Sequence, residues 1–223
     1  MHPGHLVTFG DSWAAGSGQT PTIPYGQLLC NNLQIKNFHN KAIPGSSVSN
    51  LLLQLFDYIS QHETVKNHIA IFFITTPGRS MWINHMNYVI HINLPVDTLN
   101  TKKSIDTILS EVHYKYFPST PMEQFDLNRT ILALHQVCTK TQIQDFYING
   151  WMDVKLDCAG IDKQKIYPKT CAQILGYSNQ DEFLKDSMSQ YTNPHTQACG
   201  HPTQQGHQLI ADSLYQWIKD NIV

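Results

Sequence analysis

Two short runs of apolar and β-branched residues, at 6–9 and 69–74, stand out in the first third of the chain. Both are too short for a helix and are bounded by glycine or turn residues. Consecutive apolar and β-branched residues are typical of buried parallel strands, since a half-exposed strand would alternate polar and apolar positions. We predict strands at these two places and a further short strand at 35–39.

The segments between the predicted strands carry apolar residues at every third or fourth position, the spacing of one helix face. This pattern predicts a helix from Tyr25 to Leu33, after a loop of small residues that starts at Ala14, and another from Val48 to Ile59. Ser46 or Ser47 is expected to cap the second helix. Strands that alternate with helices imply right-handed crossovers and a parallel sheet.

The second half of the chain is less regular. Segment 79–119 is polar and weakly periodic apart from a helix expected near 104–116, and we interpret it as an insertion that covers one edge of the sheet. No repeat, low-complexity tract or linker divides residues 1–223, so one α/β domain is expected. The remaining predicted elements are a helix over 121–137, a strand over 143–148, short helices near 172–175 and 181–188, and a closing helix over 209–218.

Composition narrows the class of partner. The formal net charge is −2 and only 14% of the 223 residues are charged, with no dense group of Lys and Arg, so a nucleic-acid partner is not expected. The longest apolar run, 69–74, is far shorter than the roughly 20 residues that span a bilayer. The sequence therefore predicts a soluble protein with no membrane span.

Five widely spaced cysteines include no C-x-x-C pair, so we expect free thiols in a reducing compartment. The first residues lack a basic region followed by an apolar core, and the first strand starts almost at once. A signal peptide is therefore not expected, and the predicted location is the cytoplasm.

Candidate chemistry lies near both ends of the chain. Gly10-Asp11-Ser12-Trp13 directly follows the first strand, where an α/β hydrolase presents a nucleophile on a tight turn. Gly200-His201-Pro202 precedes the closing helix, and an imidazole is the side chain best suited to take a serine proton near neutral pH. Ser12 and His201 are thus a candidate nucleophile and base, while Asp11 is expected to stabilise the turn.

These blocks resemble the SGNH (GDSL-type) hydrolases. The family's first motif matches the residues around Gly10-Asp11-Ser12. Its second motif is similar to Asn40-x-Ala42-x-x-Gly45, and its last motif is similar to His201-Pro202-x-x-x-Gly206-His207. The resemblance implies a three-layer α/β/α fold with a flavodoxin-like, mainly parallel sheet. It also implies ester hydrolysis without a cofactor, with Ser12 as nucleophile, His201 as base, and the N–H groups of Ser12 and Gly45 in the oxyanion hole.

The chain departs from the family pattern at two positions. The third block, normally G-x-N-D, is replaced by Thr75-Thr76-Pro77-Gly78-Arg79, so Thr76, Arg79 or the more distant Asn149 is a candidate substitute donor. The aspartate expected three residues before the base is Ala198. A backbone carbonyl, Asn193 or an acid from elsewhere, with Asp153, Asp157 and Asp186 as candidates by type, could orient His201 instead.

Two classes of function remain open on the sequence. The first is a serine esterase acting on small-molecule, glycan or lipid esters, with Trp13 and Arg79 as candidate substrate contacts. The second is a degenerate hydrolase fold that binds a glycan or an acylated ligand. No metal is expected, because the spacing of His195, His201 and His207 matches no helical ligand motif, and Cys199 is interpreted as incidental.

Overall fold

The structure is a computed structural model that describes residues 3–75, 80–83, 89–92, 120–150, 156, 160–188 and 192–222. A central sheet of four parallel strands has the spatial order β2-β1-β3-β6. Its strands are β1 (His5–Phe9), β2 (Asn37–Asn40), β3 (Ile69–Ile74) and β6 (Gln144–Asn149). A separate antiparallel pair consists of β4 (Ser80–Ile83) and β5 (Val89–Ile92).

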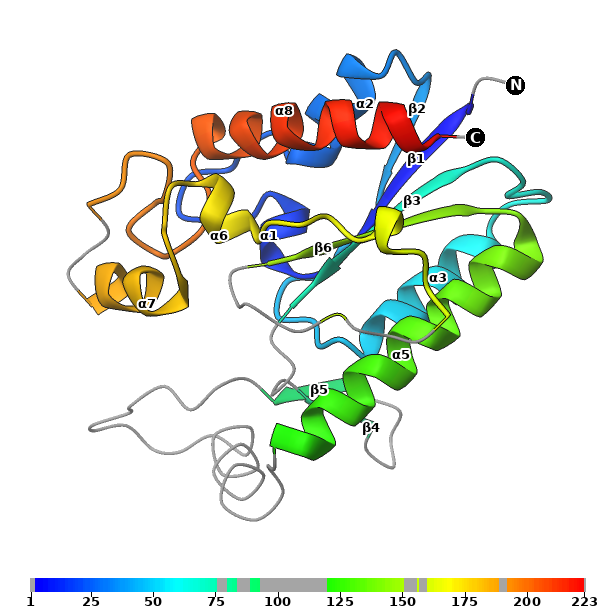
Figure 1. Cartoon of the computed structure of the whole chain (residues 1–223), viewed down its shortest axis with the longest axis horizontal. Coiled ribbons are helices and arrows are strands. Elements are labelled where there is room, and N and C mark those ends of the chain that lie inside the picture. The colour runs from blue at the N-terminus through cyan, green and yellow to red at the C-terminus, as the bar shows by residue number, and fades with distance from the viewer. Residues whose placement is uncertain are drawn as a thin grey trace.

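Helices cover both faces of the sheet, as Figure 1 shows. One face carries α2 (Tyr25–Asn32), α6 (Cys171–Ile174) and α8 (Gln204–Asn221), and the other carries α3 (Asn50–Ser60) and α5 (Thr120–Thr141). Side chains of β1 alternate between the two cores, with Leu6 in the first and Val7 and Phe9 in the second. The predicted three-layer α/β/α architecture is confirmed. The shorter helices are α1 (Ser12–Ala15), α7 (Gln180–Met188) and the 3-10 turn η1 (Lys163–Lys165).

Most predicted elements are confirmed, and two local predictions are wrong. A short helix, α1, occupies the segment where a loop was expected from Ala14. The residue before α3 is Ser49, and neither Ser46 nor Ser47 caps that helix. Both serines are buried and bond elsewhere, Ser46 Oγ accepting from Gln54 and Ser47 Oγ contacting Ser49 Oγ. Within 79–119, β4 and β5 were not predicted, and the helix expected near 104–116 lies outside the described residues.

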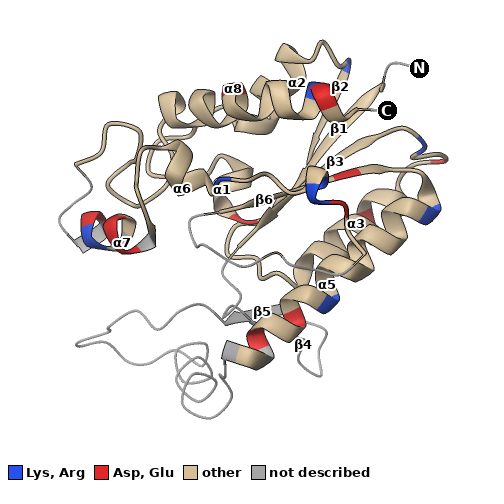
Figure 2. Cartoon of the chain, viewed as in Figure 1, with Lys and Arg blue, Asp and Glu red and all other residues tan. Residues whose placement is uncertain are grey.

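Charged residues are few on the described part of the chain. In Figure 2 the Lys and Arg positions are scattered over separate helices and loops rather than gathered on one face. Across the described ranges, no helix combines the length and apolar character that a membrane crossing requires.

A group of four histidines lies at the amino end of the sheet. His5 stacks on His68, with ring centroids 4.2 Å apart, and on His39 at 5.2 Å, so three imidazoles lie side by side across neighbouring strands. His62 covers them edge-on, and Tyr58 OH hydrogen-bonds His68 Nδ1 at 2.9 Å. Burial, and then the nearby histidines, lower the pKa of His68 to about 4.

Acidification is expected to destabilise the fold through His68, which is only 6% exposed. Its folded pKa of about 4 lies below the unfolded value of 6.5, so the unfolded chain binds the proton first and stability is lost as the pH falls from 6.5 toward 4. At pH 5 this costs about 2 kcal/mol. The free energy of unfolding, measured with urea at pH 7 and pH 5, checks it.

The matched variant is His68→Gln, which offers Tyr58 a polar partner but binds no proton in this range. The difference in pH dependence between the wild type and this variant isolates His68 from the titrating carboxylates. Identical pH dependence in the two proteins would contradict the prediction.

Candidate active site

Ser12 lies on a tight turn at the carboxyl end of β1. Gly10 has a φ of +151°, and a Cβ at this position would lie 2.8 Å from Phe73 Cβ, so the turn requires glycine. Asp11 caps α1, its carboxylate accepting from Trp13 N at 3.0 Å and from Thr75 Oγ1 at 2.7 Å. The predicted role of Asp11 in the turn is confirmed, and Ser12 becomes the first, half-buried residue of α1.

Residues 40–47, which we call the oxyanion loop after the predicted donor Gly45, lie against this turn. Asn40 Nδ2 donates to Ala14 O and Ala15 O, both at 3.3 Å, and Ile43 N donates to Gly10 O at 3.0 Å. Gly45 has a φ of +78°, which glycine adopts without strain. The first two sequence blocks are therefore joined by hydrogen bonds in the folded chain.

Two backbone donors are available at this junction. Among the described residues, neither Ser12 N–H nor Gly45 N–H donates a hydrogen bond, and no hydrogen bond engages Ser12 Oγ. Within the same part of the chain, no hydrogen bond joins Ser12 to His201 either. Such catalytic contacts often form only when a substrate is bound.

The loop that carries His201 is fastened to the segment that follows α1. Gln197 N donates to His201 O at 2.7 Å, while the side chain of Gln197 bonds Thr20 N at 3.0 Å and Thr20 O at 3.3 Å. Gln204 Oε1 accepts from Ile23 N at 2.9 Å. These contacts bring the two ends of the sequence together, and in Figure 1 the start of α8 lies beside the chain between α1 and α2.

A thiol lies at the far nitrogen of the candidate base. His201 Nδ1 is 3.2 Å from Cys199 Sγ, while Ala198, at the aspartate position of the family pattern, has no carboxylate to offer. Cys199, interpreted from the sequence as incidental, thus contacts the candidate base, and the spacing of two residues gave no signal for this contact.

Of the three aspartates considered as partners for His201, only Asp186 lies among the described residues. Asp186 accepts from Tyr177 OH at 2.7 Å and from Thr192 N and Oγ1 at 2.8 and 2.9 Å. Burial raises the pKa of this carboxyl, but these hydrogen bonds outweigh it and the net pKa is lowered. Its described contacts hold the segment between α7 and α8. Asp153 and Asp157 lie outside the described residues.

The other predicted site residues divide into two groups. Thr76 and Arg79 lie outside the described residues, so their roles stay predictions. Trp13 is 4% exposed and packs against Phe73 and Phe183, with ring centroids 6.1 and 5.7 Å away. This placement makes Trp13 a core residue beside Ser12, and little of its surface is left for a substrate. Asn149 is buried at the end of β6.

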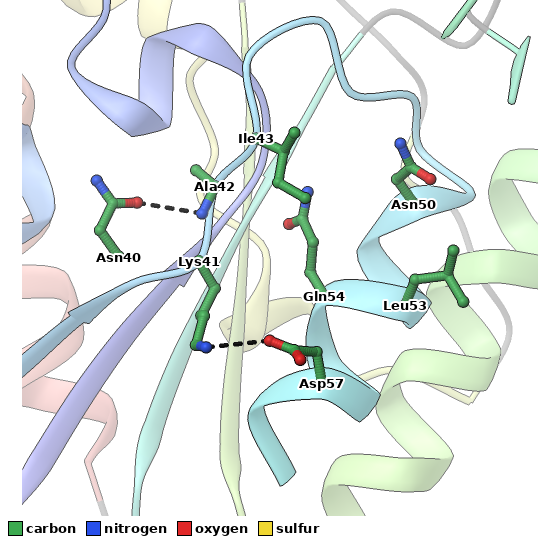
Figure 3. A pocket seen from close by; sticks show the side chains of 8 residues that line it. All are labelled: Asn40, Lys41, Ala42, Ile43, Asn50, Leu53, Gln54 and Asp57. Carbon is green, nitrogen blue, oxygen red and sulfur yellow. Dashed lines mark hydrogen bonds and ion pairs between the residues drawn. The ribbon is translucent and has the colours of Figure 1, made fainter. Parts of the chain in front are cut away.

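A groove of about 460 Å³ separates the oxyanion loop from α3. Figure 3 shows the ion pair between Lys41 and Asp57, 3.0 Å long, joining its two walls. Ile43 and Leu53, each 46% exposed, supply much of its apolar lining. Gln54, which the sequence analysis did not single out, also lines this groove.

His207, which follows the candidate base on α8, has a structural contact. His207 is fully buried, and its Nδ1 accepts from Tyr25 N at 3.3 Å. Burial, and then His201, lower the pKa of His207 to about 4, so this imidazole is neutral at pH 7. Within the described ranges, no three His, Cys, Asp or Glu side chains are arranged to hold a metal ion.

The α/β/α fold is similar to that of solved GDSL-type lipolytic proteins and esterases. Over 95% of this chain and 96% of the other, the structure is similar to a member of the lipolytic protein G-D-S-L family from Veillonella parvula, with a TM-score of 0.52 and 12% identity. It is similar to the psychrotrophic esterase EstA from Pseudoalteromonas sp. over 97% of both chains, with a TM-score of 0.53 and 14% identity.

A third similar structure is a mutant of an acetyl-xylooligosaccharide esterase from a Geobacillus species. The match covers 96% of this chain and 93% of the other, with a TM-score of 0.51 and 13% identity. No family model matches the sequence, and no curated protein matches it. At these identities the likeness extends to the fold, and the chemistry must be argued from the site.

Proposed function

We propose that this chain is a divergent SGNH (GDSL-type) serine hydrolase that cleaves carboxylic esters. The observation that carries the proposal is that three loops are tied to the chain around α1. Ser12, with no hydrogen bond to its hydroxyl among the described residues, lies at the end of β1 beside the oxyanion loop, and the His201 loop is bonded to the segment that follows α1. A nucleophile, a base and backbone donors are the groups that acyl transfer requires.

The proposed reaction uses side chains, backbone N–H groups and water. Ser12 Oγ attacks the acyl carbon as its proton passes to His201 Nε2, and the N–H groups of Ser12 and Gly45 stabilise the oxyanion. Thr76 is the proposed third donor. Collapse breaks the ester C–O bond, the alcohol leaves with the proton from His201, and water then hydrolyses the acyl-enzyme by the same route.

The substrate class proposed is an acyl or acetyl ester of a small molecule, glycan or lipid, with Arg79 as a candidate contact. We also propose a single domain over 1–223 with an insertion near 79–119.

The cytoplasmic location expected from the sequence is also part of the proposal. It is favoured by the free thiols of Cys30, Cys138, Cys171 and Cys199.

The test is labelling with a fluorophosphonate probe, which reacts with activated serines. We expect the probe to attach to Ser12, as mapped by peptide mass spectrometry, and Ser12→Ala to abolish both labelling and turnover of p-nitrophenyl esters. A panel of esters that varies in acyl length and alcohol would then define the substrate. Absence of both labelling and turnover in the wild-type protein would remove the proposal.

Cys199 is proposed as the group that orients His201 in place of the aspartate. Cys199→Ala is expected to slow fluorophosphonate labelling by about tenfold, because the imidazole loses the partner that fixes its Nδ1. Cys199→Asp supplies a stronger acceptor and is expected to restore the rate. Labelling rates measured from pH 6 to 9 check this, and an unchanged rate in Cys199→Ala would exclude the role.

The alternative is a degenerate fold that binds a glycan or acylated ligand without turnover. The observation in its favour is that no hydrogen bond joins Ser12 Oγ to His201 among the described residues. Calorimetric binding of an acetylated oligosaccharide, with no labelling at Ser12, would establish this alternative.

A further inference from the structure

We propose that Gln54 is a positioning residue that holds the two oxyanion donors at a fixed separation. The inference rests on the proposed esterase function and concerns how the site of that function is built. Gln54 lies on α3, outside all three sequence blocks, and is 3% exposed.

The amide of Gln54 connects the turn before Ser12 to the oxyanion loop. Its Oε1 accepts from Gly10 N at 2.9 Å, and its Nε2 donates to Gly10 O at 3.0 Å and to Ser46 Oγ at 2.9 Å. The side chain thus pairs with both backbone groups of Gly10 on one loop and with the buried hydroxyl of Ser46 on the other. Its acceptor and both its N–H donors are used.

The two anchored residues are neighbours of the two donors. Gly10 is two residues before Ser12, and Ser46 directly follows Gly45. Because the donor N–H groups come from separate loops, their separation depends on what ties those loops together. A shift of about 1 Å in such a site can reduce a rate by about 10²-fold.

The packing of α3 also argues for a role beyond burial. The buried face of the helix carries Leu51, Leu55 and Tyr58 beside Gln54, and Asn50 is its other buried polar residue. A leucine at position 54 would extend this apolar stripe, whereas an amide must be desolvated and is tolerated only when it is fully hydrogen-bonded. The polar choice at this position provides the link between the loops.

The first test replaces Gln54 by leucine, which preserves bulk and removes all three hydrogen bonds. At a temperature well below the melting point, we expect Gln54→Leu to lower kcat and the fluorophosphonate labelling rate by about 10–100-fold, with KM changed by less than about threefold. The control is Gln27→Leu on α2, where the lost amide bonds Asn31 on its own helix.

A second variant keeps the proposal testable if Gln54→Leu does not fold. Ser46→Ala retains the pairing with Gly10 and removes only the link to the oxyanion loop, so a smaller loss of about threefold to tenfold is expected. The double variant should be no slower than Gln54→Leu alone, because both changes break the same connection.

The outcomes separate the two proposals. If the wild type is not labelled at Ser12, the proposed function fails. If the wild type is labelled and the folded Gln54→Leu and Ser46→Ala proteins react at the wild-type rate, the inference about Gln54 fails while the function stands. A fall in melting temperature alone would likewise assign Gln54 a purely structural role.

Discussion

Replacing His201 by alanine is expected to lower kcat/KM for a p-nitrophenyl ester by about 10³–10⁴-fold. Without the imidazole, the proton of Ser12 has no acceptor as the hydroxyl attacks, and the leaving alcohol has no proton donor. The oxyanion donors of Ser12 and Gly45 would remain, so a residual rate above the uncatalysed one is expected. Initial rates at pH 7.5, with folding checked by circular dichroism, measure the effect.

The matched control for this variant is His195→Ala. His195 lies on the same loop six residues earlier and is half-buried, so the two changes remove the same side chain from similar surroundings. Only the loss of His201 should be partly reversed by added imidazole. A loss in His195→Ala as large as that in His201→Ala would contradict the assignment of the base.

Replacing Asp145 by asparagine is expected to destabilise the fold by about 3–5 kcal/mol. Asp145 is fully buried on β6 and accepts from His135 Nδ1 at 2.7 Å, Tyr147 OH at 2.8 Å and Lys165 Nζ at 2.5 Å. An amide of the same size carries no charge and can accept through one oxygen only. The ammonium group of Lys165, whose side chain is 32% exposed, would then lose its anionic partner.

Urea unfolding at pH 7 measures this change, and Asp57→Asn is the control. Asp57 pairs with Lys41 at 3.0 Å, but its side chain is 55% exposed, so breaking that ion pair should cost less than about 1 kcal/mol. Equal losses in the two variants would show that the burial of Asp145 does not govern its contribution.

The strands β1 and β3 were predictable because they are buried on both faces, whereas β2 is only partly buried. Such strands read as continuous apolar runs, and the run at 69–74 became β3 with every residue buried. The helix α1 escaped prediction because its four residues are too few to show a period, and the cap of Asp11 becomes visible only in the folded turn. In α3, Phe56 fitted the helical spacing but is 52% exposed, while Gln54 is buried.

The candidate site was partly predictable, because several of its residues directly follow strands of the sheet. Ser12 and Gly45 follow the first two strands, and the carboxyl ends of parallel strands share one edge of a sheet, so their proximity could be expected from topology. Gln54 could have been noticed as a polar residue within an apolar helical stripe. The contact between Cys199 and His201 left no comparable pattern.

The sequence by itself determined the α/β order of the elements and which residues carry candidate chemistry, because both depend on local apolar spacing and residue type. The tertiary structure decided which of those residues are joined. Gly10 is bonded to Gln54 across 44 positions and Thr20 to Gln197 across 177, and contacts over such separations require long loops of the chain to close. Local patterns predict secondary structure and the chemistry that a side chain offers, whereas the contacts of that side chain are fixed by the packing of the whole chain.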